Sequence, residues 1–201
     1  MKIQLPEKVN TIIQTLQEHG YEAYAVGGCV RDSLLGREPG DWDITTSASP
    51  EETKKLFART VDTGIEHGTV TVLLGKEGFE VTTYRIDGKY EDSRHPTEVI
   101  FTRNLREDCS AETSRSMQWH TMIQKGSSIF FGGMDDLKRK IIRCVGNARE
   151  RFWRRLRSAL CAECVFAAQL GFSLEKGTKE AMTELAPTWR RSALSGFRQS
   201  W

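Results

Sequence analysis

The stretch from residue 24 to residue 47 constrains the fold of this chain more than any other part. It reads Tyr-Ala-Val-Gly-Gly-Cys-Val-Arg-Asp-Ser-Leu-Leu-Gly-Arg-Glu-Pro-Gly-Asp-Trp-Asp-Ile-Thr-Thr-Ser. An apolar run ends at Gly27-Gly28, where a backbone without Cβ atoms can approach a ligand closely. Helical spacing follows from Cys29 to Leu35 and stops at Gly36. The pattern therefore predicts a strand, a glycine turn, a short helix, a loop and a second strand.

The start of the predicted short helix has the character of a phosphate-binding site. Its first backbone N–H groups have no acceptor within the helix, and such a terminus attracts anions. Arg31 lies on the first turn, where its guanidinium can add a bidentate contact to the same anion. We therefore expect Gly27, Gly28 and Arg31 to bind a phosphate group.

Asp41-Trp42-Asp43 leads into the second strand. Because side chains alternate along an extended strand, Asp41 and Asp43 are expected on one face and Trp42 on the other. Two neighbouring carboxylates attract a divalent cation, and hard oxygen ligands beside a phosphate site suit Mg²⁺. Asp-x-Asp alone is a weak signal and could be a solvated turn. Its combination with the upstream Gly-Gly-x-Val-Arg-Asp motif makes the metal-binding interpretation specific.

Together these motifs resemble the head domain of the class II tRNA nucleotidyltransferases (CCA-adding enzymes) and of the closely related bacterial poly(A) polymerases. The resemblance implies an α/β (α+β) head over residues 1–145, with a mixed, mostly antiparallel sheet and packed helices. A partial and disrupted all-helical neck would follow over residues 146–201. In this interpretation Asp41 and Asp43 hold Mg²⁺, Glu80 completes the carboxylate cluster, and the glycine turn binds the nucleoside triphosphate.

The implied reaction transfers CMP or AMP from CTP or ATP to the 3′-hydroxyl of tRNA and releases pyrophosphate. Two other functions stay open. Poly(A) addition uses the same head motifs and would differ in the neck and tail. The chain could also be a non-catalytic remnant that only binds nucleotide or metal.

The sequence around the motifs predicts the other elements of the head. Two helices are expected, at 6–19 and from 49 to about 57, the second opened by a capping box with proline at its first position. Strands are expected at 60–63, 68–75 and 79–85, the last two joined by a turn at Gly75-Lys76-Glu77-Gly78. Alternation places Glu80 on the face opposite Val81, although a solvated strand carboxylate is the alternative.

Several other features have ordinary interpretations. The polar segment from Asp87 to Pro96 resembles the flexible loop that the family carries beside its active site. His67 and His95 could be metal ligands, but the four histidines show no ligand spacing, which favours surface or loop roles. Cys161-Ala-Glu-Cys164 is a single Cys-x-x-Cys without partners and is a weak signal for zinc or redox chemistry.

The resemblance breaks after Asp108. The family continues with Leu-x-Arg-Arg-Asp-Phe-Thr-x-Asn-Ala-x-Ala, which resembles the motif that reads the ribose and triphosphate. This chain instead has Cys-Ser-Ala-Glu-Thr-Ser-Arg-Ser-Met-Gln-Trp-His. Agreement returns at 131–146 and at 166–172, and it is absent from 153–165 and 189–201.

The genetic code accounts for these breaks. When the frame is shifted, the dipeptides Met-Gln and Trp-His within 109–129 each force an alanine codon. The whole stretch can then encode Leu-Arg-Arg-Asp-Phe-Thr-Ile-Asn-Ala-Met-Ala, the missing motif. Shifts also permit family-like or helical patterns in 153–165 and 189–201. We therefore interpret the chain as a truncated family member translated through several frameshifts, and we expect 109–129 and 189–201 to lack regular structure.

Composition narrows the location and the partners. No apolar segment approaches the ~20 residues that cross a bilayer, and the N-terminus does not resemble a signal peptide. The five cysteines are scattered without a disulfide framework, which suits the cytosol. We expect a cytoplasmic protein without membrane contact, whose partners are the tRNA 3′ end, CTP and ATP. No protein partner can be predicted.

Overall fold

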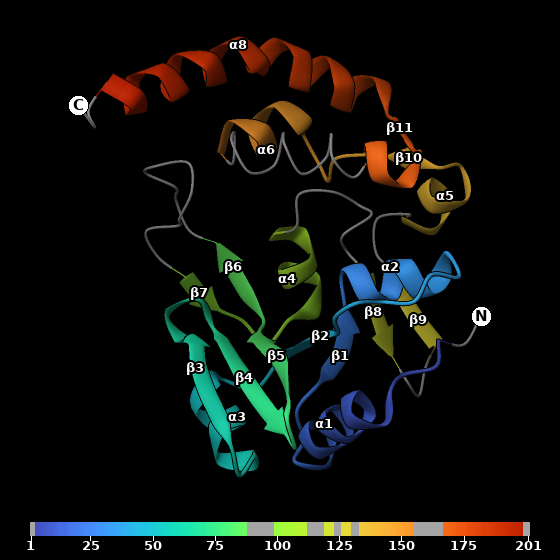
Figure 1. Ribbon diagram of the computed structural model, residues 1–201, viewed down its shortest axis with the longest axis vertical. Coiled ribbons are helices and arrows are strands. Elements are labelled where there is room, and N and C mark those ends of the chain that lie inside the picture. Colours follow the sequence, from blue (N-terminus) through green and yellow to red (C-terminus); the bar gives the residue numbers. More distant parts are fainter. Residues whose placement is uncertain are drawn as a thin grey trace. The chain divides into compact units, whose positions relative to one another are not determined.

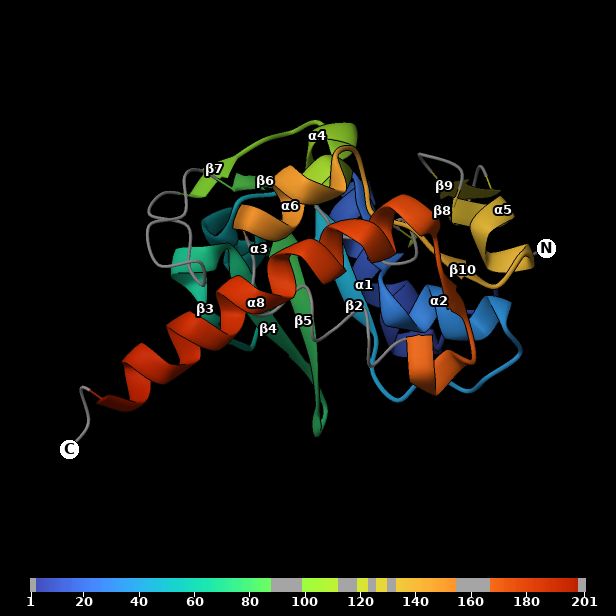
Figure 2. The same ribbon diagram turned by 90° about the horizontal axis from the view of Figure 1, so that it is seen from above.

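The computed structural model of the chain describes residues 3–87, 99–111, 119–122, 126–129, 133–154 and 167–198. Contacts divide the molecule into two compact units. The first holds the described residues up to 129 and the second holds those from 133 onward (Figures 1 and 2).

The first unit contains five helical segments and nine strands among its described residues. They are α1 (Glu7–Glu18), β1 (Ala23–Val26), α2 (Gly28–Leu34), β2 (Asp43–Thr46), α3 (Pro50–Leu56), β3 (Thr60–Gly64), the 3-10 helix η1 (Ile65–His67), β4 (Thr69–Leu74), β5 (Glu77–Thr83), β6 (Arg85–Asp87), β7 (Val99–Phe101), α4 (Leu105–Ala111), β8 (Trp119–Met122) and β9 (Gly126–Ile129). The second unit contains α5 (Gly133–Lys138), β10 (Ile141–Ile142), α6 (Ala148–Arg154), β11 (Ser173–Leu174) and α8 (Lys176–Arg198).

A seven-stranded sheet forms the centre of the first unit, in the order β3-β4-β5-β2-β1-β8-β9. Every neighbouring pair is antiparallel except β2 and β5, which run parallel. Strands β6 and β7 pair separately as a two-stranded sheet (Figure 1). The expected mixed, mostly antiparallel sheet with packed helices is confirmed.

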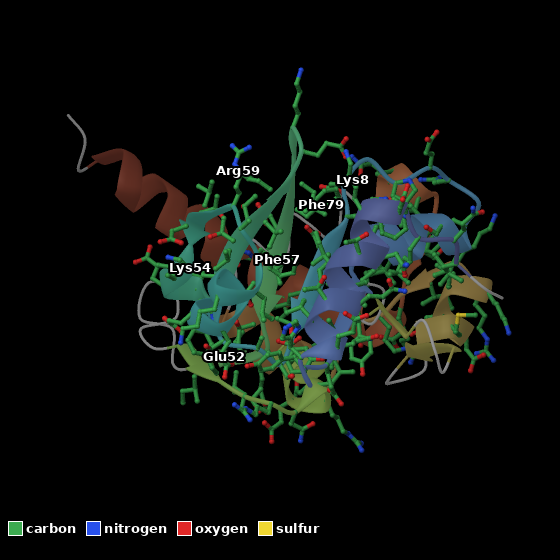
Figure 3. The ribbon with its side chains drawn as sticks, turned by 90° about the horizontal axis from the view of Figure 1, so that it is seen from below. Lys8, Glu52, Lys54, Phe57, Arg59 and Phe79 are labelled. Carbon is green, nitrogen blue, oxygen red and sulfur yellow. The ribbon has the colours of Figure 1, made fainter. Side chains whose placement is uncertain are left out.

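The two faces of this sheet differ in chemistry. Ile44 and Val81 are adjacent across β2 and β5 and are both buried, as are Val70 and Val72 on β4. Helix α1 buries four apolar side chains at helical spacing, Val9, Ile12, Ile13 and Leu16. It contacts β1 and β2, while α3 contacts β4 and β5. These two helices, seen from below in Figure 3, therefore cover the apolar face, and each buried aliphatic side chain contributes about 1.5–3 kcal/mol.

Several predicted boundaries shift by one or two residues. Helix α1 begins at Glu7, because Pro6 has φ −56° and ψ 147° and is the N-cap residue, not the first helical residue. Strand β5 begins at Glu77, so the turn is only Gly75-Lys76. Gly75 has φ 69°, as a two-residue hairpin with glycine in first position requires. The capping box at Ser49 is present as predicted.

The second unit is mainly helical. Helices α6 and α8 pack through a core of buried side chains, Cys144, Phe152, Ala181, Met182 and Leu185. Ile141 and Ile142 of β10 pair in parallel with β11. This pairing places α5 and β10 with the second unit, whereas the sequence predicted a boundary near residue 145. The assignment of the units to a head and a neck therefore remains a proposal. No helix in the described residues is long and apolar enough to span a membrane.

The expectation that the out-of-family stretches lack regular structure is wrong for several segments. Residues 119–122 and 126–129 form β8 and β9, and α8 continues through residues 189–198. Strand β8 pairs with Ala25 and Val26 of β1, an edge that accepts any segment of suitable β-propensity. Arginine, alanine and leucine in 189–198 favour a helix whatever their origin. Residues 88–98 and 155–166, with the Cys-x-x-Cys pair, lie outside the described part.

Lys140 provides a test of the second unit. It is exposed and has φ 55°, a left-handed conformation that costs a non-glycine residue about 1–2 kcal/mol. Its backbone N–H donates to Leu137 O, and its carbonyl accepts from Ser173 N. The side chain is not needed for these bonds, so Lys140→Gly should raise the free energy of unfolding in urea by about 1 kcal/mol. The neighbouring exposed control, Arg139→Gly, should lower it, and a destabilising Lys140→Gly would contradict the strain.

Candidate functional site

The parallel pairing of β2 with β5 brings two acidic residues together. Ile44 lies beside Val81 in the register, so the preceding residues, Asp43 and Glu80, also lie beside each other. Asp43 is the first residue of β2 and is opposite Val26 of β1. Because side chains alternate, Asp43 and Glu80 share the face opposite the buried Ile44 and Val81. Glu80 is exposed, and Asp43 is half-buried.

Asp41 lies just before β2 in irregular backbone, so the predicted strand through the Asp-x-Asp motif begins only at Asp43. Its carboxylate is nevertheless close enough to Asp43 to act on it electrostatically. Asp41, Asp43 and Glu80 line one cleft of about 810 Å³. The three predicted acidic residues therefore meet in one place, and we call them the carboxylate cluster.

The pKa of Asp43 reflects both its burial and the neighbouring carboxylates of the cluster. Burial, followed by the neighbouring charges of Asp41 and Glu80, raises the pKa of Asp43 to about 6. A divalent cation would remove this repulsion, and carboxylate oxygens are the ligands that Mg²⁺ prefers. Among the described residues, no group of three or more His, Cys, Asp or Glu side chains is placed so that it could hold a metal ion. The donor chemistry of the cluster fits a hard cation.

The glycine turn follows directly after the partner of Asp43. Val26 pairs with Asp43, and the next residue, Gly27, is the N-cap of α2 with φ 73° and ψ −135°. Residues with a Cβ atom rarely adopt this conformation, so glycine at position 27 is required by the backbone. Helix α2 then begins at Gly28, one residue earlier than predicted.

Arg31, the predicted phosphate ligand, is buried and already bonded to a neighbouring carboxylate. It is only 7% exposed, and its guanidinium forms a fork with Asp32, from Nε to Oδ1 and from Nη2 to Oδ2, both at 3.0 Å. Nη2 also lies near Gly28, about 3.5 Å from where a Cβ atom would stand. Asp32 thus fixes the orientation of the guanidinium beside the glycine turn.

The first turn of α1 also borders the cleft. Lys8 forms an ion pair with Glu77 at the start of β5, and both residues line the cleft with Phe79. Figure 3 shows Lys8 and Phe79 near each other. This contact joins residues far apart in the chain, so no local sequence pattern could have indicated it.

The remaining sequence candidates have structural roles. The backbone carbonyl of His67 accepts a hydrogen bond of 2.7 Å from Arg85 Nη1. Cys29 is buried behind the glycine turn, and its Sγ donates to Val26 O. Burial raises the pKa of the Cys29 thiol to about 11, which makes it unreactive. His95 lies outside the described residues.

The sheet order and the carboxylate cluster beside a glycine turn define a class of domain, the nucleotidyltransferase head. Comparison with known proteins identifies the family: the profile of the poly A polymerase head domain matches residues 23–143. The chain belongs to this family.

Individual relatives agree with the family assignment. A CCA-adding enzyme from Lactiplantibacillus plantarum is 43% identical over 202 residues, covering 98% of this chain and 49% of the relative. The crystal structure of the Bacillus stearothermophilus CCA-adding enzyme in complex with CTP superposes with a TM-score of 0.80 at 38% identity, covering 92% of this chain and 44% of that one. A tRNA nucleotidyltransferase complexed with a primer tRNA and an incoming ATP analogue gives a TM-score of 0.67 at 26% identity, covering 88% and 50%. The chain therefore spans about half the length of the relatives it matches.

The raised pKa of Asp43 predicts a dependence of stability on pH in the metal-free protein. The folded pKa of about 6 lies above the reference value of 3.8. The contribution of Asp43 to stability is therefore fully present below about pH 4 and is lost as the pH rises through about 6. Asp43→Asn stays neutral, so it should raise the melting temperature at about pH 8 and change it little at about pH 4.

Magnesium should reverse this difference. Above about pH 6, Mg²⁺ should raise the melting temperature of the unsubstituted chain, because binding to the folded state stabilises it, and should do so much less for Asp43→Asn. Glu18→Gln removes an exposed carboxylate at the end of α1 and should behave like the parent chain. An Asp43→Asn variant that is less stable than the parent at about pH 8 would contradict the described repulsion.

Proposed function

We propose that this chain derives from a Mg²⁺-dependent tRNA nucleotidyltransferase that adds CMP and AMP to the tRNA 3′ end. The observation that carries the proposal is the carboxylate cluster of Asp41, Asp43 and Glu80 next to the Gly27-Gly28 turn. The relatives that share this head domain are named CCA-adding enzymes, and related structures contain CTP or an ATP analogue with a primer tRNA. CTP, ATP and the tRNA 3′ end are therefore the proposed substrates.

Asp41 and Asp43 would hold Mg²⁺, with Glu80 completing the negative site. When bound, the cation would activate the RNA 3′-hydroxyl and neutralise the charge that develops on the leaving pyrophosphate. The half-buried position of Asp43 limits competition from water, which strengthens electrostatic contacts there. Glu80 lies on the neighbouring strand β5 and adds negative charge beside Asp43.

Gly27, Gly28 and Arg31 would bind the triphosphate. The backbone conformation of Gly27 leaves no side chain between the turn and a phosphate group. Arg31 would act from a fixed orientation, because Asp32 already occupies its fork with two hydrogen bonds of 3.0 Å. This arrangement limits the loss of side-chain freedom on binding. The cytoplasmic location expected from the cysteine pattern is part of the same proposal.

A non-catalytic remnant is the second candidate. It is favoured by one observation, the absence of an in-frame Arg-Arg-Asp-Phe motif after Asp108. By family resemblance, this motif is the element that positions the ribose and triphosphate. Positioning carries much of phosphoryl-transfer catalysis, and effective molarities of well-placed groups reach about 10⁵–10⁸ M. A head that retains only the metal and phosphate contacts would bind its substrates and turn them over poorly. Poly(A) addition stays an alternative, because the head motifs do not separate it from CCA addition.

A primer-extension assay separates these possibilities. The chain as written should add CMP or AMP to tRNA lacking its 3′ end poorly or not at all. A version in which 109–129, 153–165 and 189–201 are returned to the family frame should be active with Mg²⁺, because the positioning motifs are then present.

Asp41→Ala in the frame-corrected version should abolish this activity by removing a metal ligand, with little effect on folding. Asp62→Asn is a matched control, because Asp62 forms only a surface ion pair with Lys54. Equal rates from the written and corrected chains would show that the frame interpretation is wrong. Long adenylate tails in place of a defined CCA end would favour poly(A) addition.

A further inference from the structure

The carboxylate of Asp108, on α4, joins two strands of the first unit. Its Oδ1 accepts a hydrogen bond of 2.9 Å from the backbone N–H of Arg85, just after β5. Its Oδ2 lies 3.4 Å from the hydroxyl of Thr45 on β2. The same Thr45 hydroxyl lies 3.1 Å from the carbonyl oxygen of Thr82 on β5. Asp108, Thr45 and the end of β5 thus form one polar link.

This link lies on the face of the sheet that carries the carboxylate cluster. Thr45 is two residues after Asp43, and Thr82 is two residues after Glu80. Residues two apart on a strand share a face and are separated by roughly 7 Å. Thr45 and Thr82 are also paired in the register. Asp108 therefore joins β2, at the residue two after Asp43, to the start of β6, which follows β5 after Tyr84. The contact to β5 at Thr82 is made by Thr45 itself.

The start of α4 does not depend on this carboxylate. Asn104 Oδ1 accepts a hydrogen bond of 3.0 Å from Arg106 N, and Glu107 accepts one from the hydroxyl of Thr102. These contacts hold the first turn of the helix by themselves. Asp108 instead directs its carboxylate across to β2 and to Arg85, the first residue of β6, the strand beside which α4 packs (Figure 1).

We propose that Asp108 is a positioning residue for the carboxylate cluster: it joins Thr45 of β2 to Arg85 at the start of β6, two residues after β5, and so fixes Asp43 relative to Glu80. This inference rests on the proposed function, because it assigns Asp108 to the geometry of the same metal site. Asp43 is the first residue of a four-residue strand, so a contact in the middle of that strand bears directly on its placement. Loosening the link lets Asp43 and Glu80 move apart, which weakens the binding of a cation between them.

The affinity of the full chain for Mn²⁺, measured from the electron paramagnetic resonance signal of the free ion, tests this. Outer-sphere partners of metal ligands change metal affinity by about 10–100-fold. Asp108→Ala should weaken Mn²⁺ binding about tenfold, the lower end of this range. Thr45→Val removes the hydroxyl without changing side-chain shape and should have a similar effect. Both substitutions remove the contact between Asp108 and Thr45, so the loss in the double variant should be smaller than the sum of the two single losses.

Two further variants separate positioning from simple stability and from charge. Glu107→Ala removes the neighbouring carboxylate of α4 and its bond to Thr102, and it should leave Mn²⁺ affinity unchanged even if the melting temperature falls. Asp108→Asn keeps an oxygen for Arg85 N and places an amide that can donate to Thr45 Oγ1. It should therefore restore most of the affinity that Asp108→Ala loses.

Each outcome decides the matter. Wild-type affinity in Thr45→Val, additive losses in the double variant, or an Asp108→Asn variant as weak as Asp108→Ala would overturn the positioning role. If Asp108→Ala does not fold, parent-like Mn²⁺ affinity in Thr45→Val still overturns the role. If the parent chain binds Mn²⁺ no better than Asp43→Asn does, the metal site of the proposed function fails, and the role of Asp108 fails with it. Asp43-dependent binding that survives Thr45→Val refutes only Asp108.

Discussion

The constraint on which the site depends is the parallel pairing of β2 with β5 in an otherwise antiparallel sheet. This pairing sets Ile44 beside Val81, so Asp43, which opens β2, lies beside Glu80 in the middle of β5. Burial of Asp43, followed by the neighbouring charges of Asp41 and Glu80, raises the pKa of this carboxyl. An apo protein loses stability from such an arrangement, whereas a cation-binding protein uses it.

The opposite face of the same sheet compensates for this cost. The buried side chains of α1 and the valines of β4 form a continuous apolar layer, and about 25 cal/mol per Å² of buried apolar surface favours folding. Each strand therefore serves two purposes through its alternation. In β5, Val81 contributes to the core while Glu80 stays exposed for the site. Gly27 ends β1 in a conformation reserved for glycine and brings a bare backbone to the same place.

The sequence predicted much of this arrangement, because its signals are local. The glycine turn, the capping box at Ser49 and the alternation around Glu80 each depend on a few adjacent residues. The fork between Arg31 and Asp32 was not predicted, because Arg31 was assigned to a phosphate and Asp32 was given no role. The contribution of Lys8 to the cleft could not be predicted, since it depends on the ion pair that brings α1 to Glu77 at the start of β5. The strand order, with β8 beside β1, also requires tertiary information, and it overrode the expectation of irregular structure at 119–122.

Asp108 connects the site to the question of the reading frame. It is the last residue that agrees with the family pattern before the first break, and its carboxylate lies on the face of the carboxylate cluster. We propose above all that Asp41, Asp43 and Glu80 form one cation site. Anomalous diffraction from crystals of the chain grown with Mn²⁺ tests it most directly. The account predicts an anomalous peak bound by the carboxylates of Asp41 and Asp43; well-ordered carboxylates at that position without a peak, or a Mn²⁺ peak only elsewhere, would contradict it.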